Sequence, residues 1–323
     1  MSKTPHDTLI KAILGKPEHA ATALRAILPA ALCEALDWSA LRTEPTEYVR
    51  VDGGTRRSDL LFSVPFRAQP PRETPLREVP AREALIYVLF EHQSTEDTLM
   101  ALRLFVYVAR IFEQRVLRAG NAAVPLIVPV VLAHAERPWS APVALDGLYD
   151  APRALLDALG PLVPRLSYAL EDLTVMSDAE MEARVADAVV RMTWTALRDA
   201  RSANDLMAYA KRLYDLLVAA HHQDGHAFVE LVGYLIRTHN PDLATARKVA
   251  AMLPPEARED VVNAYDELRA EGRRLTLATQ IQLKFGALSD TARACLDAAD
   301  EASLDLWTER ILFAATLDEL FAG

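Results

Sequence analysis

Two short apolar runs in the first third of the chain end in or contain an acidic residue. Residues 84–90 include no glycine or proline, are rich in Ile, Val, Tyr and Phe, and run directly into Glu91-His92-Gln93. This composition predicts a buried strand rather than a helix. Because side chains alternate along a strand, Leu89, Glu91 and Gln93 are expected on one face and His92 on the other.

A second acid stands in an upstream run, residues 57–64, which also reads as a strand and carries Asp59 near its start. Residues 46–51 are strand-like too, and Asp52-Gly53-Gly54 between the two runs is a hairpin signal. If Asp59 and Glu91 lie on neighbouring strands and share a face, they form an oxygen-rich site for Mg²⁺ or Mn²⁺. This pairing is the central hypothesis from the sequence.

The remaining elements of the first half alternate between helix and strand. Residues 6–36 show helical spacing in short pieces, and residues 98–118 form a long amphipathic pattern in which Arg103 and Tyr107 share a face. Residues 124–132 and 165–173 are strand-like. The pattern predicts a mixed α/β sheet covered by helices, in a domain spanning residues 1–175.

The second half is almost wholly helical by its pattern. Expected helices cover residues 178–200, 203–220, 226–237, 242–252 and 256–272, with prolines between several of them. We divide this half into a helical region, 176–272, and a small helical domain, 273–323. Packed helical hairpins of this kind could mediate homo-oligomer formation.

Charge and composition narrow the classes of function. The net charge of −10 over 323 residues argues against broad, sequence-independent binding of a polyanion. Arginines nevertheless cluster around the two acids, and residues 65–82 alone hold five prolines and four arginines, a composition that excludes a regular element. Such clustering suits a phosphodiester substrate, although most individual arginines simply face solvent.

Other signals place limits on location and cofactors. No apolar run is long enough to span a bilayer and the start lacks a signal peptide, so the expected location is the cytoplasm. The distant Cys33 and Cys295 form no zinc-type pair. His222 and His226 are one turn apart but lack the glutamate of an HExxH motif, and no phosphate-binding glycine loop or GxSxG elbow is present.

Several short motifs, taken in order, resemble a known family. They are Pro5-His6-Asp7, Ser58-Asp59-Leu60-Leu61, Phe90-Glu91-His92-Gln93-Ser94, Leu102-Arg103-Leu104 with Tyr107, and Ile127-Val128-Pro129-Val130-Val131-Leu132. Their order and spacing resemble the recombination-promoting nucleases, also called YhgA-like transposases, of the PD-(D/E)XK superfamily. The resemblance covers roughly the first half of the chain.

This resemblance implies a restriction-endonuclease-like mixed sheet flanked by helices. It implies that Asp59 and Glu91 are metal-binding acids and that Gln93 stands where the superfamily usually has lysine. It places Arg103 and Tyr107 on the helix beside the active site, as substrate-binding residues or, alternatively, as surface or packing residues. Lys11, one turn after Asp7, is a further candidate for substrate binding, with a surface role on the first helix as its alternative. Two departures are Ser58 in place of proline before Asp59, and Ala133-His134-Ala135 after the later strand.

The function expected from these features is a Mg²⁺- or Mn²⁺-dependent DNA endonuclease that hydrolyses phosphodiester bonds in recombination or transposition. The alternative is a weak or inactive nuclease-fold module that binds DNA or protein, which Gln93 and the acidic net charge favour. A third class, a metal-free hydrolase using two carboxylates, is disfavoured by the arginine clustering.

Overall fold

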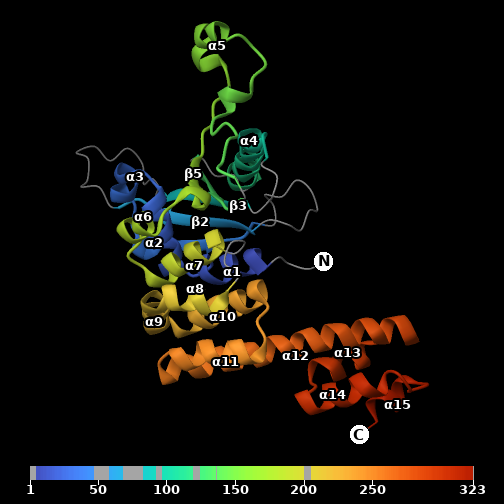
Figure 1. The fold of residues 1–323 in the computed structure, drawn as a ribbon. Helices are drawn as coiled ribbons and strands as arrows, with labels where there is room; N and C mark the ends of the chain where they lie inside the picture. Colours follow the sequence, from blue (N-terminus) through green and yellow to red (C-terminus); the bar gives the residue numbers. More distant parts are fainter. Residues whose placement is uncertain are drawn as a thin grey trace.

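A five-stranded sheet forms the centre of the first half of the chain (Figure 1). The structure, a computed structural model, describes residues 5–46, 58–67, 83–91, 97–118, 124–135, 137–199 and 205–322; for 58–59, 83 and 88–91 it describes the backbone. The strands follow one another in space in chain order: β1 (Arg42–Glu44), β2 (Ser58–Pro65), β3 (Glu83–Glu91), β4 (Leu126–Ala133) and β5 (Ala169–Asp172).

The sheet is mixed, as the pattern predicted. Strands β1, β2 and β3 pair antiparallel, whereas β3, β4 and β5 pair parallel. A parallel pair needs a crossover, and the α4 helix (Met100–Phe112) provides the one between β3 and β4. The predicted fold class, a mixed sheet with helices followed by a helical half, is therefore confirmed.

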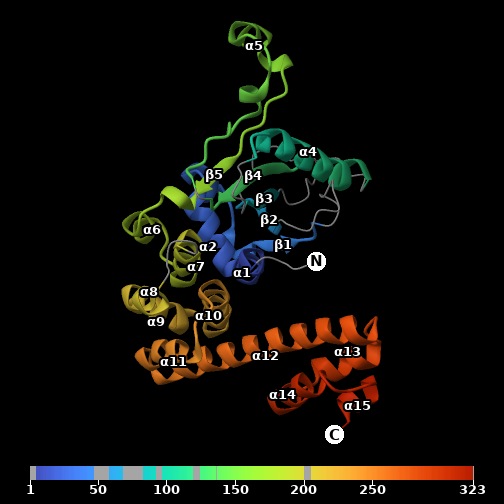
Figure 2. The same cartoon turned by 45° about the vertical axis from the view of Figure 1, so that its right-hand side comes forward.

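The two faces of the sheet are covered by different helices (Figures 1 and 2). On one face, Leu61, Tyr87 and Val131 pack against α4. On the other, Phe62, Ile86 and Leu132 belong to a larger core shared with α1 (Pro5–Leu14), α2 (Pro17–Ile27) and α7 (Ala188–Asp199). Alternation along β2 and β3 produces this division, and it places each strand residue on the α4 face or the α1 face.

An arm projects from the sheet between β4 and β5 (Figure 1). It carries α5 (Arg153–Leu159) near its tip, and Ala144 and Ser167 form an antiparallel bridge along its length. At its base, the backbone N–H of Trp139 donates to Asp172 Oδ2 over 2.8 Å. The predicted strand at 165–173 is thus only four residues long, because its first part runs along the arm.

Helices of the second half stack in layers below the α1 face (Figures 1 and 2). In both views, α9 and α10 lie between α7 and the pair α11 and α12. The α13, α14 and α15 helices pack on the far end of α12. The bounds are α3 Ala30–Ala35, α6 Asp178–Arg184, α8 Leu206–Arg212, α9 Tyr214–Gln223, α10 Gly225–His239, α11 Leu243–Met252, α12 Pro255–Phe285, α13 Asp290–Asp297, α14 Glu301–Arg310 and α15 Leu317–Phe321.

Three helix predictions were wrong in their bounds. The segment expected as one helix over 203–220 is divided into α8 and α9, with Leu213 between them. The segment expected as one helix over 178–200 is broken into α6 and α7, because Asp187 caps the second helix by accepting from the N–H of Val190 over 2.9 Å. The helix expected to end near Gly272 continues to Phe285. Burial of Leu277 and Ile281 against the last helices offsets the cost of a glycine inside it.

The hydrophobic core does not stop at the predicted domain boundary near residue 175. One cluster of buried side chains extends from Leu9 in α1 to Tyr265 in α12, and a separate cluster, with Leu277 and Ile281 at its centre, unites the end of α12 with the last three helices. The helical region therefore shares its core with the α1 face of the sheet. The three domain ranges stay predictions, and the boundary at 272 falls within α12.

Some predicted features fall outside the described residues. These are the strand expected at 46–51 beyond residue 46, the Asp52-Gly53-Gly54 turn, and most of the proline-rich connection, 68–82. The strand next to β2 is instead β1, whose Glu44 pairs with Leu61. Within the described ranges, none of the helices combines the length and the apolar character that crossing a membrane requires.

Candidate functional site

The backbone register relates the two acids of the central hypothesis. In the antiparallel pairing of β2 and β3, Asp59 lies opposite Leu89. Residues directly opposite share a face, and Leu89 and Glu91 share a face because they are two apart. Positions 59 and 91 are therefore diagonal neighbours on one face, a relationship that typically separates Cα atoms by about 7–8 Å.

That face is the one covered by α4. Leu61, two residues from Asp59, and Tyr87, four residues from Glu91, both belong to the core under α4. The other face of the sheet carries α1, α2 and α7. The register thus assigns both acid positions to the face of the sheet that α4 covers.

Two of the predicted substrate-binding residues lie on this helix. Tyr107 is buried and packs edge-on against Tyr87, with ring centroids 5.7 Å apart. Arg103, one turn earlier, is partly exposed and pairs through Nη2 with Asp97, just before α4 begins. Tyr107 therefore has a packing role on the α4 face, and Arg103 orients a carboxylate, although not one of the two predicted acids.

The other predicted site residues are placed differently. Lys11 lies on α1, which packs on the opposite face of the sheet from α4. It is partly exposed, one turn beyond the buried Asp7. Gln93 lies outside the described residues, two positions after β3 ends at Glu91.

Sequence reasoning missed a third acid on the α4 face. Glu44 of β1 lies opposite Leu61 and so shares the face of Asp59. Its two carboxylate oxygens accept from Ser63 Oγ over 2.7 Å and from Arg115 Nη2 over 2.5 Å. Burial alone raises the pKa of Glu44, but these two hydrogen bonds outweigh it and hold the pKa below its usual value. Glu44 is thus an ionised acid with both oxygens engaged.

Part of the arginine cluster is also engaged by acids. Arg115 and Arg118 lie in a π-helical turn, Glu113–Arg118, that continues α4. Arg115 pairs with Glu44, and Arg118 Nη2 lies 2.6 Å from Glu113 Oε1. Six other arginines of the cluster lie outside the described residues: Arg50, Arg56, Arg57, Arg72, Arg77 and Arg82.

Two histidines meet at the end of β4. Ala133, the last residue of β4, is the parallel partner of Glu91, and the next residue, His134, is buried. The His134 ring lies 5.7 Å, centroid to centroid, from the ring of His6 in the first turn of α1. Nδ1 of His6 lies 2.8 Å from the hydroxyl of Tyr234 in α10. Sequence reasoning singled out the Pro5-His6-Asp7 motif but not this long-range contact.

A second polar cluster lies between α2 and the helical region. Glu18, His19 and Asp224 offer atoms close enough to hold a metal ion. However, Lys16 Nζ lies 2.5 Å from Asp224 Oδ2, and the two ring nitrogens of His19 already face Asp187 and Asp224. An ammonium group occupies the position a cation would need, so this cluster reads as a salt-bridge network.

The chemistry of the donors at positions 59 and 91 suits a hard divalent cation. Carboxylate oxygens, completed by water, are the ligands that Mg²⁺ and Mn²⁺ prefer. The backbone register places positions 59 and 91 as diagonal neighbours on adjacent strands, a spacing at which two carboxylates can share one ion.

Comparison with known proteins places the chain in a family. Residues 4–227 match the family model described as "Putative transposase, YhgA-like", and the chain belongs to that family. The matched region includes the whole sheet and extends through α9. No solved structure matches the chain.

The chain is similar to several curated proteins of Escherichia coli. It is 30% identical to recombination-promoting nuclease RpnD of strain O157:H7 over 242 residues, which cover 73% of this chain and 83% of that protein. It is 27% identical to recombination-promoting nuclease RpnA of strain K12 over 282 residues, 84% of this chain and 86% of the relative. A third relative, 28% identical over 279 residues, 85% of this chain and 84% of its own length, is named an inactive recombination-promoting nuclease-like protein, RpnE.

Proposed function

We propose that this protein is a metal-dependent DNA endonuclease that hydrolyses phosphodiester bonds during recombination or transposition. The observation that carries the proposal is the register of β2 and β3, because it assigns Asp59 and Glu91 to diagonal positions on one face. The family supports it, since relatives over most of the chain are named recombination-promoting nucleases.

In this proposal, Asp59 and Glu91 hold one divalent ion, Mg²⁺ or Mn²⁺, through their carboxylates. When bound, such an ion lowers the pKa of a coordinated water and offsets charge that develops on the scissile phosphate. Gln93 orients the attacking water through its amide, because it carries no charge and cannot act as a base near neutral pH. Arg103 contacts the DNA phosphates from the α4 side of the sheet and Lys11 contacts them from the α1 side, while Tyr107 supports the helix that carries Arg103.

A second function, a nuclease-fold module without catalysis, is favoured by two specific observations. Gln93 stands where the PD-(D/E)XK superfamily usually has lysine, and one relative of similar coverage is named inactive. The net charge of −10 also disfavours tight binding of DNA through the whole surface. The two functions differ in whether DNA is cut.

Incubation of the full-length protein with supercoiled plasmid, with and without Mg²⁺, separates them. The nuclease proposal expects metal-dependent nicking that falls by at least about a hundredfold in Asp59→Ala and in Glu91→Ala, as expected when a metal ligand is removed. Binding of DNA without nicking, in Mg²⁺ and in Mn²⁺, supports the non-catalytic module instead.

Glu44→Gln is the matched control. Glu44 lies on the same face as Asp59, on the neighbouring strand, but both of its oxygens are held by Ser63 and Arg115. Removing its charge is expected to lower thermal stability while leaving metal-dependent nicking near the wild-type level. Equal loss of nicking in Glu44→Gln and Asp59→Ala would argue against a specific role for Asp59.

A further inference from the structure

Three side chains in contact connect the helical region to the end of the sheet at which β3 and Glu91 lie. Tyr234 of α10 is fully buried, and its hydroxyl forms a hydrogen bond with Nδ1 of His6. The Tyr234 and His6 rings meet edge to face at a centroid distance of 5.4 Å. The His6 ring also lies beside the ring of His134, with centroids 5.7 Å apart.

The position of His134 gives this contact its importance. It follows Ala133, whose Cα is paired with that of Glu91 in the parallel register of β3 and β4. Adjacent strands run about 4.8 Å apart. His134 therefore supports the backbone at the end of β4, one residue beyond the partner of a proposed metal-binding acid, and it does so from the α1 face.

The contact also sets the position of the first turn of α1. His6 precedes Asp7, which is buried, and α1 packs directly against both β2 and α10. A hydrogen bond from a buried tyrosine restricts the rotation of His6 and, through it, the end of the helix. The tyrosine that makes this bond comes from α10, beyond the region matched by the family model.

We propose that Tyr234 is a positioning residue for the candidate metal site: its hydroxyl holds His6, and His6 holds His134 and the end of β4 next to Glu91. The inference rests on the proposed metal site at Asp59 and Glu91. It assigns the helical region a part in the site, so that the sheet domain depends on α10 for the geometry of its metal-binding edge.

Tyr234→Phe tests this by removing one oxygen and leaving the ring in the core. Three quantities are measured on the full chain: Mn²⁺ affinity by calorimetry, the melting temperature, and the rate of plasmid nicking. We expect Tyr234→Phe to weaken Mn²⁺ binding by about three- to tenfold, the size of one net hydrogen bond, with a melting temperature within about 3 °C of wild type.

Tyr265→Phe is the matched control, because Tyr265 of α12 is another buried tyrosine whose hydroxyl accepts from Arg269 over 3.4 Å. It is expected to leave Mn²⁺ affinity and nicking unchanged. A double-mutant cycle of Tyr234→Phe with His6→Ala adds a second test. If the hydroxyl acts through His6, the two losses of Mn²⁺ affinity will not add.

Each outcome decides between the ideas. Unchanged Mn²⁺ affinity in Tyr234→Phe, or additive losses in the cycle, overturns the positioning role. Mn²⁺ binding that depends on Asp59 and weakens in Tyr234→Phe, without any nicking by the wild type, supports the positioning role and refutes the nuclease activity. Absence of Mn²⁺ binding by the wild type refutes both.

Discussion

Nδ1 of His19 lies 2.9 Å from Oδ2 of Asp187, although 168 residues separate them in the chain. Nε2 of the same ring lies 3.1 Å from Oδ2 of Asp224, the residue that caps α10. His19 is buried at 1% exposure, and it links α2 to the beginnings of α7 and α10. A ring that faces a carboxylate at both nitrogens donates to both only when it is protonated.

The pKa values of the three groups move in the directions that this geometry requires. Burial lowers the pKa of His19, but the hydrogen bonds with Asp187 and Asp224 outweigh it and raise the pKa above its usual value. Burial raises the pKa of Asp187, and bonds from His19 and the N–H of Val190 lower it further than burial raises it. For Asp224, the bonds from Lys16, Ala227 and His19 likewise outweigh burial and lower the pKa.

We predict that stability of the wild type falls as pH rises above neutrality. A group whose pKa is raised in the folded state stabilises the fold fully when the pH is below its unfolded-state pKa, which is about 6.5 for histidine. This stabilisation is lost as the pH rises through the folded-state pKa. The two aspartates stabilise the fold when the pH is above about 3.9, their unfolded-state pKa. They lose this stabilisation as the pH falls through their lowered folded-state pKa values. The contribution of the cluster is therefore greatest between about pH 4 and pH 6.5, as urea unfolding at pH 5 to 9 will test.

His19→Gln is expected to lose about 2 kcal/mol of unfolding free energy at pH 6, because it leaves the buried Asp187 carboxylate without a charged partner, whereas Asp224 keeps Lys16. The difference in unfolding free energy between His19→Gln and wild type should be smaller at pH 8.5, where His19 of the wild type has lost its proton. His226→Gln, an exposed histidine on α10, is the control and should follow the wild-type pH dependence. A deficit that stays constant across this range would contradict a protonated His19.

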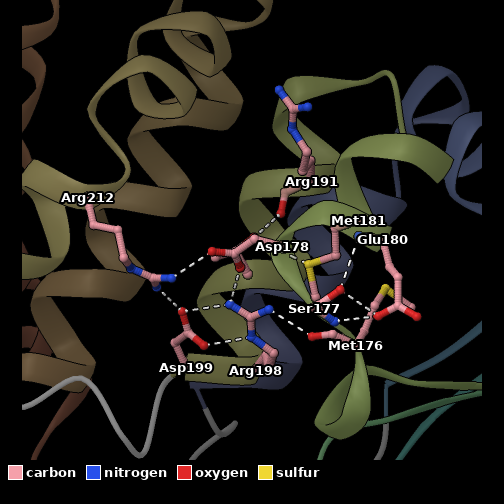
Figure 3. A network of polar contacts seen from close by, with 10 residues as sticks. Met176, Ser177, Asp178, Glu180, Met181, Arg191, Arg198, Asp199 and Arg212 are labelled. Carbon is pink, nitrogen blue, oxygen red and sulfur yellow. Dashed lines mark hydrogen bonds and ion pairs between the residues drawn. The ribbon is translucent and has the colours of Figure 1, made fainter.

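A second network, shown in Figure 3, joins α6, α7 and α8. Asp199 accepts from Arg198 Nε over 2.7 Å and is also paired with Arg212. Arg198 and Arg212 both reach Asp178, over 2.5 and 2.8 Å. Burial lowers the pKa of Arg198, but its bonds with Asp199 and Asp178 outweigh it and raise the pKa. Two guanidinium groups are thus held close together by two carboxylates.

We predict that Asp199→Asn destabilises the protein by about 2 kcal/mol, because it leaves two close cations with one carboxylate between them. Asp178→Asn should cost less, about 0.5 kcal/mol, since the Asp178 side chain is 55% exposed and solvent screens its pairs. Urea unfolding of both variants at pH 7 measures the difference. Equal losses would mean that the two carboxylates are equivalent despite their different burial.

A further prediction concerns Gln93 and depends on the proposed nuclease activity. Gln93→Lys is expected to speed metal-dependent nicking by about tenfold or more, because an ammonium group stabilises negative charge that an amide cannot. The plasmid assay at saturating Mg²⁺ measures it. Gln93→Met, which removes the amide at similar volume, is the control and should be slower than wild type.

Gln93→Lys combined with Asp59→Ala should not increase the nicking rate, because the lysine can speed the reaction only when the metal site is intact. If Gln93→Lys is no faster than wild type, another cation supplies this charge, and Arg103 and Lys11 are the residues to replace next.

The strands that carry Asp59 and Glu91 could be predicted from the local sequence pattern alone. Residues 84–90 concentrate β-branched and aromatic side chains in a short run, which predicts a strand, and β3 spans Glu83–Glu91. The helix ends were less readable. Asp187 separates two helices because its side chain accepts from the N–H of Val190. Gly272 does not end α12, because burial of Leu277 and Ile281 outweighs the low helix propensity of glycine.

The sequence by itself determined the class of fold, the strands that carry Asp59 and Glu91, and the family resemblance, because these depend on the period of apolar residues and on short motifs. Only the tertiary structure decided which distant side chains meet. Glu44 with Arg115, His19 with Asp187, and Tyr234 with His6 come from separate elements whose packing no local pattern encodes. Packing of the apolar faces brings polar side chains of distant elements close together. Because an unpaired buried polar group is costly, those side chains then form hydrogen bonds or ion pairs with one another.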